Sequence, residues 1–244
     1  MPIDKSEAII LRTQNLGEQD KLVVFFSREK GLIKGVAKGA RKFNNRFGSS
    51  LEPFSVVKIL YYEKEKHDLV TISNCDLLES AFELFGEIKL SCALAYVAEL
   101  VEKFSPYREK EEVLYRLLVS FIRTLKDGQR IEYLTHYFEF WFLKINGILP
   151  DWNICQKCRR PLHNQAYLNS RRDGFLCSRC VEDQKLTLNQ NQLKALDWIR
   201  KNAPAAPHET GLAAEEWKQL GRVFQAIILY HLEETPRSLS FVDF

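Results

Sequence analysis

The sequence predicts an α+β protein in which a small five-stranded barrel precedes an all-α region that carries a four-cysteine metal-binding insert. Short runs of β-branched and aromatic residues, separated by turn residues, fill the first 80 positions. From residue 81 onward the apolar residues recur every three or four positions, as they do on one face of a helix. Residues 151–182 lose that period and hold four of the six cysteines. We therefore expect a barrel domain at 1–80 and a helical domain at 81–244, with the insert at 151–182.

Five strands are expected in the barrel region, and glycine, asparagine, aspartate or proline residues separate them. A polar turn at 64–68 precedes the last strand. Five short strands fit the partly open barrel of the OB-fold, although SH3-like barrels give a similar pattern. The expected strands span 8–13, 22–26, 32–36, 54–62 and 69–72.

Amphipathic helices are expected on both sides of the insert. Asn189, with Gln192 three residues later, has the pattern of a capping box that begins a helix. Two prolines at 203–211 predict a loop before the last helix. Such apolar stripes are typical of a packed helical core, and we interpret them in this way rather than as a cofactor site. The stripes lie at 90–104, 114–125 and 134–145 before the insert, and at 189–199 and 217–228 after it.

Four cysteines of the insert have the spacing of a metal site. Cys155-x-x-Cys158 is followed after 18 residues by Cys177-x-x-Cys180. Two residues between thiolates let each pair occupy one edge of a tetrahedron, and Gly174 suits a turn before the second pair. Four thiolates leave no open ligand position, which predicts one structural Zn²⁺ per chain, with iron as the alternative metal.

Other interpretations of the cysteines are less favoured. Two disulfides would require an oxidising compartment that nothing else in the sequence supports. A redox Cys-x-x-Cys motif normally occurs once, at the start of a helix. His163 could replace one cysteine as a ligand, but four sulfur atoms are sufficient. We expect Cys75 and Cys92, which belong to no motif, to be small buried hydrophobic residues.

Positive charge is concentrated in one segment. The whole chain has 35 basic and 32 acidic residues, and its net charge of +3 indicates no particular partner. Residues 28–46, however, contain seven lysines and arginines against the single acid Glu29, a net charge of +6. Cations neutralise phosphates, and rings such as Phe43 and Phe47 can stack on unpaired bases. The segment therefore predicts a nucleic-acid interface, with a solvated charged surface as the plainer alternative.

The insert region is basic as well. Residues 154–180 carry six basic residues and one acidic residue, a net charge of +5. Part of this charge would balance an anionic zinc–thiolate cluster. A second nucleic-acid surface here is the weaker hypothesis.

Motifs of several enzyme and membrane classes are missing from the sequence. It has no P-loop, no G-x-S-x-G nucleophile elbow and no H-E-x-x-H metal motif, and its five histidines have no ligand spacing. We therefore expect a protein that is not an enzyme. The longest apolar run, at 92–98, has seven residues, far fewer than the roughly 20 of a membrane span. Because residues 1–7 also lack the apolar core of a secretory signal, we expect a cytoplasmic protein.

Several short motifs resemble those of the RecO family of bacterial recombination mediators. The most specific is K-G-A-R-K at 38–42, which precedes L-E-P-F at 51–54. The resemblance runs in order from about residue 7 to residue 180. Only some members have the four cysteines, which therefore support a metal without defining the family. The other resembling segments are 7–11, 30–32, 46–48, 77–80 and 147–150.

This resemblance implies an N-terminal OB-fold, a helical domain and a zinc-binding insert. It also implies binding to single- and double-stranded DNA at the nucleoid, annealing of complementary strands, and cooperation with RecR. Together with RecR, such proteins help RecA replace single-strand binding protein (SSB) on DNA. Matched by position, the DNA contacts implied for this chain are Lys34, Lys38, Arg41, Lys42 and Arg46.

Three other functions remain open from the residues alone. The first is an RNA-binding zinc-ribbon protein of translation or ribosome assembly, which a competition between RNA and DNA of one sequence would separate. The second is a zinc hydrolase, and the third is an adaptor that binds only proteins.

Overall fold

A computed structural model of the 244-residue chain describes residues 3–63, 68–182, 186–204, 210–232 and 234–241. Residues 64–67 of the expected turn and 205–209 of the expected loop lie outside this described part. The chain forms two compact units, which divide between Lys126 and Asp127. The first compact unit thus contains the barrel and the two helices that follow it. The predicted boundary after residue 80 instead marks the change from strands to helices.

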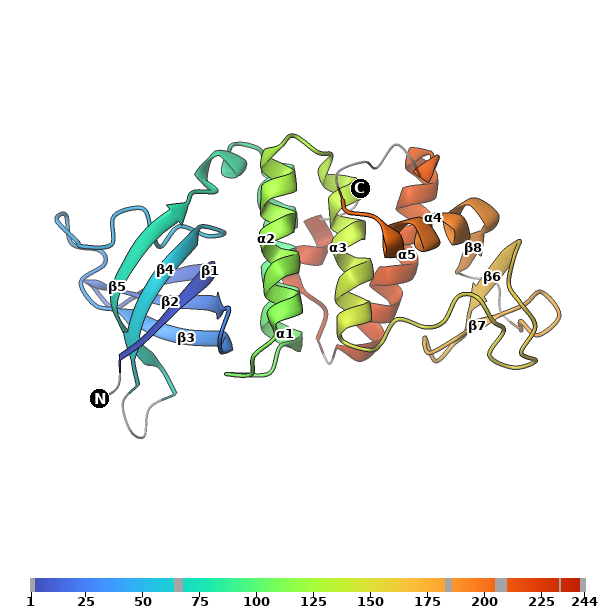
Figure 1. Cartoon of the computed structure of the whole chain (residues 1–244), viewed down its shortest axis with the longest axis horizontal. Helices are drawn as coiled ribbons and strands as arrows, with labels where there is room; N and C mark the ends of the chain where they lie inside the picture. The colour runs from blue at the N-terminus through green and yellow to red at the C-terminus, as the bar shows by residue number, and fades with distance from the viewer. Residues whose placement is uncertain (1–2, 64–67, 183–185, 205–209, 233, 242–244) are drawn as a thin grey trace. The chain divides into compact units, whose positions relative to one another are not determined.

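Five strands of the first unit close into a barrel in the order β1-β2-β3-β5-β4 (Figure 1). β3 and β5 pair in parallel, and all the other neighbours pair antiparallel, with β1 joining β4 to β2. The predicted OB-type barrel is confirmed. The strands are β1 (Ile3–Leu16), β2 (Asp20–Ser27), β3 (Gly31–Ala37), β4 (Val56–Tyr62) and β5 (Val70–Glu79).

The first and last strands are longer than the sequence pattern predicted. β1 continues through polar residues because it has two partners in succession. Its residues 3–9 pair with β4 and its residues 8–16 pair with β2, with an irregularity between Ile10 and Arg12. A strand that supplies hydrogen bonds to two neighbours can extend past its apolar segment, since pairing rather than side-chain burial defines its ends.

The barrel interior is filled by inward-facing apolar residues from all five strands, and by three residues of the β3–β4 connection, Ala40, Phe47 and Leu51. Phe47 is 3% exposed and Leu51 is 2% exposed, and both belong to the barrel core. Cys75 is buried in the same core, as predicted. Among the rings, those of Phe25 and Tyr61 lie 5.5 Å apart between centroids. The β3–β4 connection is therefore anchored in the core of the fold.

A short 3₁₀ turn, Phe82–Gly86, leads to α1 (Ile88–Phe104) and α2 (Glu112–Lys126). The segment that joins the two helices lies against β3. Its Arg108 amide donates to the Leu32 carbonyl at 3.0 Å, and Tyr107 forms a parallel bridge with Leu32. Gly31 permits this approach, because a Cβ atom there would lie 1.8 Å from the Glu109 carbonyl oxygen. Its φ of +61° also favours glycine.

The second unit is mainly helical, with α3 (Ile131–Ile145), α4 (Gln190–Lys201) and α5 (Ala214–His231). A three-stranded sheet in the order β7-β6-β8 belongs to the insert and its exit, which the sequence pattern did not predict in full. The predicted capping box is confirmed: Asn189 accepts from the Gln192 amide, and the Gln192 side chain accepts from the Asn189 amide. The small strands are β6 (Gln165–Leu168), β7 (Phe175–Leu176) and β8 (Thr187–Asn189).

Close packing of α3 on α5 depends on one glycine. A Cβ atom at Gly221 would lie 2.1 Å from Cε1 of His136. The buried His136 ring also stacks on the Trp217 ring at 6.4 Å, and its Nδ1 lies 2.7 Å from a Glu139 carboxylate oxygen. Within the described residues, none of the helices combines the length and the apolar content that a bilayer span requires.

Candidate nucleic-acid interface and metal centre

Four cysteine sulfurs of the second unit gather within 4.8 Å of one another. They belong to Cys155, Cys158, Cys177 and Cys180, the predicted ligand set. The Cys158 and Cys177 sulfurs are 3.7 Å apart. Four sulfurs that each lie about 2.3 Å from one tetrahedral metal ion are separated by roughly 3.8 Å, so the spacing fits a shared zinc ion. All six cysteines of the chain are free thiols, and His163 is not a member of the group.

Backbone hydrogen bonds shape the two cysteine turns. The Arg159 amide donates to the Cys155 carbonyl at 2.8 Å, and Arg159 adopts a left-handed conformation with φ of +62°. In the second turn the Cys180 amide donates to the Cys177 carbonyl at 2.9 Å. The two turns meet where the Cys177 amide points to the Cys155 sulfur at 3.4 Å. Each turn thus directs its pair of thiols toward the other pair.

Gly174 ends the turn before β7, where its carbonyl accepts from the Asn169 amide at 3.0 Å, and it has a second role besides this turn. A Cβ atom at this position would lie 2.3 Å from the side chain of Gln156, which follows the first cysteine. The Gln156 amide donates to the Phe175 carbonyl at 2.8 Å, and its side-chain oxygen accepts from Asn169 at 2.7 Å. The glycine therefore makes room for the residue that ties the first cysteine turn to β7.

Neighbouring groups alter the ionisation of three of the four thiols, those of Cys155, Cys177 and Cys180. Burial opposes ionisation of Cys155, but hydrogen bonds from the Cys158, Cys177 and Lys157 amides outweigh burial and lower its pKa to about 6. The Cys180 thiol is hydrogen-bonded to Cys158 and partly desolvated, which raises its pKa to about 12. Four thiolates this close repel one another unless a cation lies among them. The donor set therefore suits a divalent, thiophilic metal ion.

Seven cations of residues 28–46 separate into two groups in the structure. Arg28, Lys30 and Lys34 form ion pairs with acids of the first unit. The remaining four are exposed and lie beyond the end of β3, and we call residues 38–46 the cationic loop. Its cations are Lys38, Arg41, Lys42 and Arg46.

Lys34, the fifth predicted DNA contact, lies in a different setting. Its Nζ atom is 3.6 Å from a carboxylate oxygen of Glu102 on α1. The same carboxylate pairs with Arg12 at 2.8 Å. Lys34 lies on β3, whereas Lys38 comes directly after the strand ends at Ala37. A contact between Lys34 and DNA stays a prediction, as do the contacts of the four loop cations.

The cationic loop is held at both ends. Near its start the Gly39 amide donates to Asp20 at 2.8 Å, and the Arg41 guanidinium donates to the Gly17 carbonyl at 2.7 Å. At its end the Asn45 side chain donates to the Lys42 carbonyl and accepts from the amides of residues 47 and 48, each at 3.0 Å. The Arg46 guanidinium lies over the buried Phe47 ring, 4.7 Å from its centroid. The loop is thus a defined turn that carries exposed cations.

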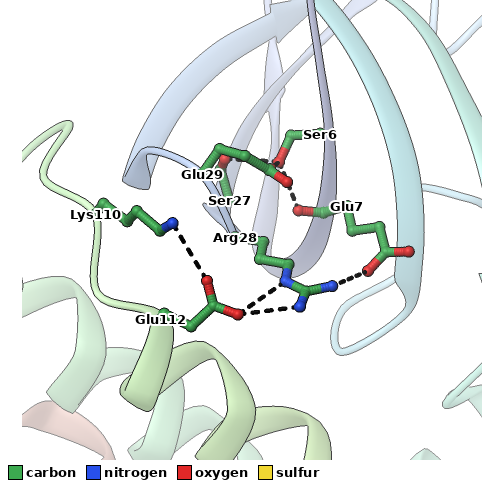
Figure 2. Close-up of polar contacts among 7 residues, drawn as sticks. All are labelled: Ser6, Glu7, Ser27, Arg28, Glu29, Lys110 and Glu112. Atoms are coloured by element: carbon green, nitrogen blue, oxygen red, sulfur yellow. Dashed lines mark hydrogen bonds and ion pairs between the residues drawn. The ribbon is translucent and has the colours of Figure 1, made fainter.

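Arg28 links the barrel to α2 (Figure 2). Its guanidinium pairs with Glu112, the first residue of α2, at 3.0 Å, and with Glu7 of β1 at 3.3 Å. The hydrogen bond from Arg28 lowers the pKa of Glu112, and Lys110 at 3.4 Å adds to the effect. A carboxylate at this position also complements the positive end of the helix dipole. Arg28 is therefore neutralised within the fold.

Two serine hydroxyls lie beside the β2–β3 turn, which contains Arg28 (Figure 2). Ser6 and Ser27 are buried, and their hydroxyl oxygens are 2.8 Å apart. Ser6 also donates to the Glu29 carboxylate, and the Lys30 amide donates to Ser27 at 3.1 Å. These contacts fix the turn that precedes Gly31. The first part of the basic segment, residues 28–31, therefore has a structural role in holding this turn.

Acidic partners of these cations were missed by sequence reasoning. Glu112 is 84 positions from Arg28 and Glu102 is 68 positions from Lys34, and on the sequence both acids look like solvated helix charges. No local pattern marks them. The only available signal was the position of Glu112 at the start of a predicted helix, which favours an acid whatever its partner.

The insert presents a second set of cations. Lys157 pairs with Glu182 at 3.3 Å, and Arg172 donates to the Asn169 carbonyl at 3.2 Å. Four arginines of the insert are exposed around the cysteine group: Arg159, Arg160, Arg171 and Arg179.

Comparison with known proteins matches the chain over nearly its whole length. The family model described as "Recombination protein O N terminal" matches residues 1–81, and "Recombination protein O C terminal" matches residues 86–240. A protein of Koribacter versatilis is 32% identical over 99% of this chain and 98% of its own length. One of Pelotomaculum thermopropionicum is 30% identical over 100% and 94%, and one of Dehalococcoides mccartyi is 28% identical over 98% and 94%. All three are named DNA repair protein RecO.

Proposed function

The chain belongs to the recombination protein O (RecO) family, and from this premise we propose that it is a DNA repair protein that binds DNA through the cationic loop. It acts on single- and double-stranded DNA as a recombination mediator. With RecR it helps to load RecA onto single strands covered by SSB. Such a ligand would place the protein at the nucleoid of the cytoplasm.

The single observation that carries the DNA-binding proposal is the separation of the basic segment into paired and exposed cations. Three cations are engaged by carboxylates of the first unit, whereas Lys38, Arg41, Lys42 and Arg46 are exposed on an anchored turn. Residues 38–48 contain no acid. The loop therefore contributes no carboxylate of its own that would repel an approaching phosphate.

Annealing follows from the same electrostatics. Two complementary strands repel each other through their phosphates, and a protein that neutralises both lowers that barrier without covalent chemistry. The exposed arginines of the insert offer a second group of cations for the other strand. This role needs no catalytic residue, so we propose that the protein is not an enzyme.

In this proposal the metal is one structural Zn²⁺ held by Cys155, Cys158, Cys177 and Cys180. A closed shell of four thiolates leaves no position for a substrate or a reactive water. The ion would fix the insert by joining two cysteine turns that are 19 or more residues apart in sequence.

The salt dependence of single-strand binding tests the interface. For Lys38→Ala combined with Arg41→Ala, we expect weaker binding and a log–log salt slope that is shallower by about 1.4, because each lost phosphate contact removes roughly 0.7. The matched control removes two exposed cations from helices of the second unit, Lys194→Ala with Arg222→Ala, and should leave the slope unchanged. An unchanged slope for the loop variant would show that the interface is elsewhere.

The ribosomal or translational alternative is disfavoured because both family models belong to recombination proteins and together span almost the whole chain. Competition between single-stranded DNA and RNA of one sequence provides the direct comparison. A clear preference for RNA would favour the alternative, since the 2′-hydroxyl is the only added recognition group on an otherwise similar strand.

A further inference from the structure

Phe43 is the most exposed of the large hydrophobic side chains described, with a relative exposure of 101%. The other aromatic residue of the region, Phe47, is buried in the barrel core. A ring that is fully in water adds nothing to the hydrophobic stabilisation of the fold, which depends on area removed from water. Burial within this chain therefore does not account for the phenylalanine at this position.

The ring is presented by a fixed piece of backbone. On one side the Lys42 amide donates to the Gly39 carbonyl at 3.0 Å. On the other side the Asn45 side chain spans the turn, bonding to the Lys42 carbonyl and to the amide of the buried Phe47. Binding of a ligand to Phe43 would therefore cost little conformational entropy of the loop.

Charge around the ring indicates the chemistry of its ligand. Lys42 precedes Phe43 directly, and Arg41 and Arg46 are two and three positions away, all exposed. The partner must therefore combine a flat apolar surface with closely spaced negative charge. An unpaired nucleotide has both, because its base offers a flat π-face and the same nucleotide carries a phosphate. In a duplex the base faces are already stacked on one another and are not available to a side chain.

We propose that Phe43 is a stacking platform for an unpaired nucleobase, and that it gives the cationic loop a preference for single strands over duplex. The inference rests on the proposed function, since phosphate contacts by the neighbouring cations bring the strand to the ring. It adds a division of labour: the cations supply affinity for any DNA, and the ring distinguishes unpaired from paired bases.

Three ligands of equal length test this in the full-length protein: a single strand, a duplex, and a strand of abasic sites that keeps its phosphates. Phe43→Ala should weaken single-strand binding about 5- to 150-fold, the range for loss of one stacked base. Affinity for the duplex and for the abasic strand should stay unchanged, as should the salt slope, because no charge is removed. The thermal midpoint should also equal that of the wild type, since the side chain is exposed.

A second variant supplies an independent readout. The four tryptophans of the chain all lie in the second unit, at 141, 152, 198 and 217. Phe43→Trp therefore adds a fluorophore to the barrel unit that has no native counterpart there. We expect it to keep single-strand affinity and to show fluorescence quenching by single strands beyond that of the wild type. Duplex and abasic strands should give no added quenching.

Several results would overturn the inference while leaving the DNA-binding proposal intact. One is that Phe43→Ala binds single strands as tightly as the wild type does, while the binding of the wild type is salt-dependent. Another is an equal loss on all three ligands, which would indicate a disturbed loop. Binding of the wild type, and not of Phe43→Ala, to anionic phosphatidylglycerol vesicles with unchanged DNA binding would assign the ring to a lipid surface. A wild type without salt-dependent DNA binding would refute the proposed function and this inference together.

Discussion

Gly31→Ala perturbs the contact by which the α1–α2 segment lies on the barrel, and its effect can be estimated from the structure. Alanine at φ of +61° costs about 1–2 kcal/mol, of which roughly 0.4–1 is recovered because the unfolded chain is less flexible. In addition, the new Cβ would lie 1.8 Å from the Glu109 carbonyl oxygen, so backbone must move. Overpacking of this kind adds about 1–3 kcal/mol, which gives roughly 2–4 kcal/mol in total.

Gly17→Ala is the matched control. Gly17 has the same φ of +61°, but a Cβ atom there meets nothing within 4 Å. It therefore carries the conformational cost alone, about 1 kcal/mol or less after the unfolded-state term. The difference between the two variants isolates the close approach of residue 109.

Native-state hydrogen exchange is the most direct assay, with urea unfolding followed by far-ultraviolet circular dichroism beside it. The Arg108 amide, bonded to the Leu32 carbonyl at 3.0 Å, should exchange about 5- to 150-fold faster in Gly31→Ala than in Gly17→Ala. If both variants lose the same stability and the Arg108 amide keeps its protection, the segment does not depend on Gly31 and the reasoning is refuted.

Three further predictions concern the metal, an ion pair and a helix contact. Removal of the metal with a chelator should release the Gln156 amide, bonded to Phe175 at 2.8 Å, to fast exchange, while the barrel amide of Ile10 stays protected. Loss of protection at both would contradict a local role. Because Arg28 lowers the pKa of Glu112 below 4.5, this pair stabilises the fold above that value and stops doing so as the pH falls through the lowered pKa. Urea midpoints of the wild type should therefore decline more steeply on acidification than those of Glu112→Gln, and parallel curves would exclude the linkage. Gly221→Ala should destabilise the second unit by about 1–3 kcal/mol, because its Cβ would lie 2.1 Å from the His136 ring. Tryptophan fluorescence during unfolding reports on this unit, since all four tryptophans lie in it. A stabilised variant, as helix propensity alone predicts, would show that the contact is absent.

The fold class and the gathering of the four cysteines could be predicted because both depend on local patterns. Strand and helix periods are repeated many times within each element, and two Cys-x-x-Cys motifs specify a tetrahedral site almost by themselves. The capping box at Asn189 is similarly local. The three-stranded sheet of the insert was predicted only in part, since β7 has two residues and β8 has three, too few for an alternating pattern.

The arrangement within the basic segment could not be predicted, because it depends on partners far away in sequence. Seven cations in 19 residues look alike until the fold brings carboxylates to three of them. Glu112 pairs with Arg28 and Glu102 with Lys34, while Lys30 pairs with Asp4 and Glu63. Phe43 and Phe47 are equally indistinguishable on the sequence, and only the path of the loop buries one and exposes the other. Long-range ion pairs and the choice between two nearby rings are properties of tertiary packing.

The anchoring of Phe47 in the barrel core has a consequence for reading mutant phenotypes. Its ring belongs to the same core as Ile33 and Val57, although its backbone ends the cationic loop. A substitution deep in that core, such as one that leaves a cavity beside Phe47, would allow the loop to drift without touching any cation. If the cationic loop binds DNA as proposed, strains that carry such a change would show defective DNA binding together with a nearly normal amount of folded protein. A genetic screen would then assign an interior residue to the nucleic-acid surface. Only the burial of that residue would reveal that it acts indirectly, through the position of the loop.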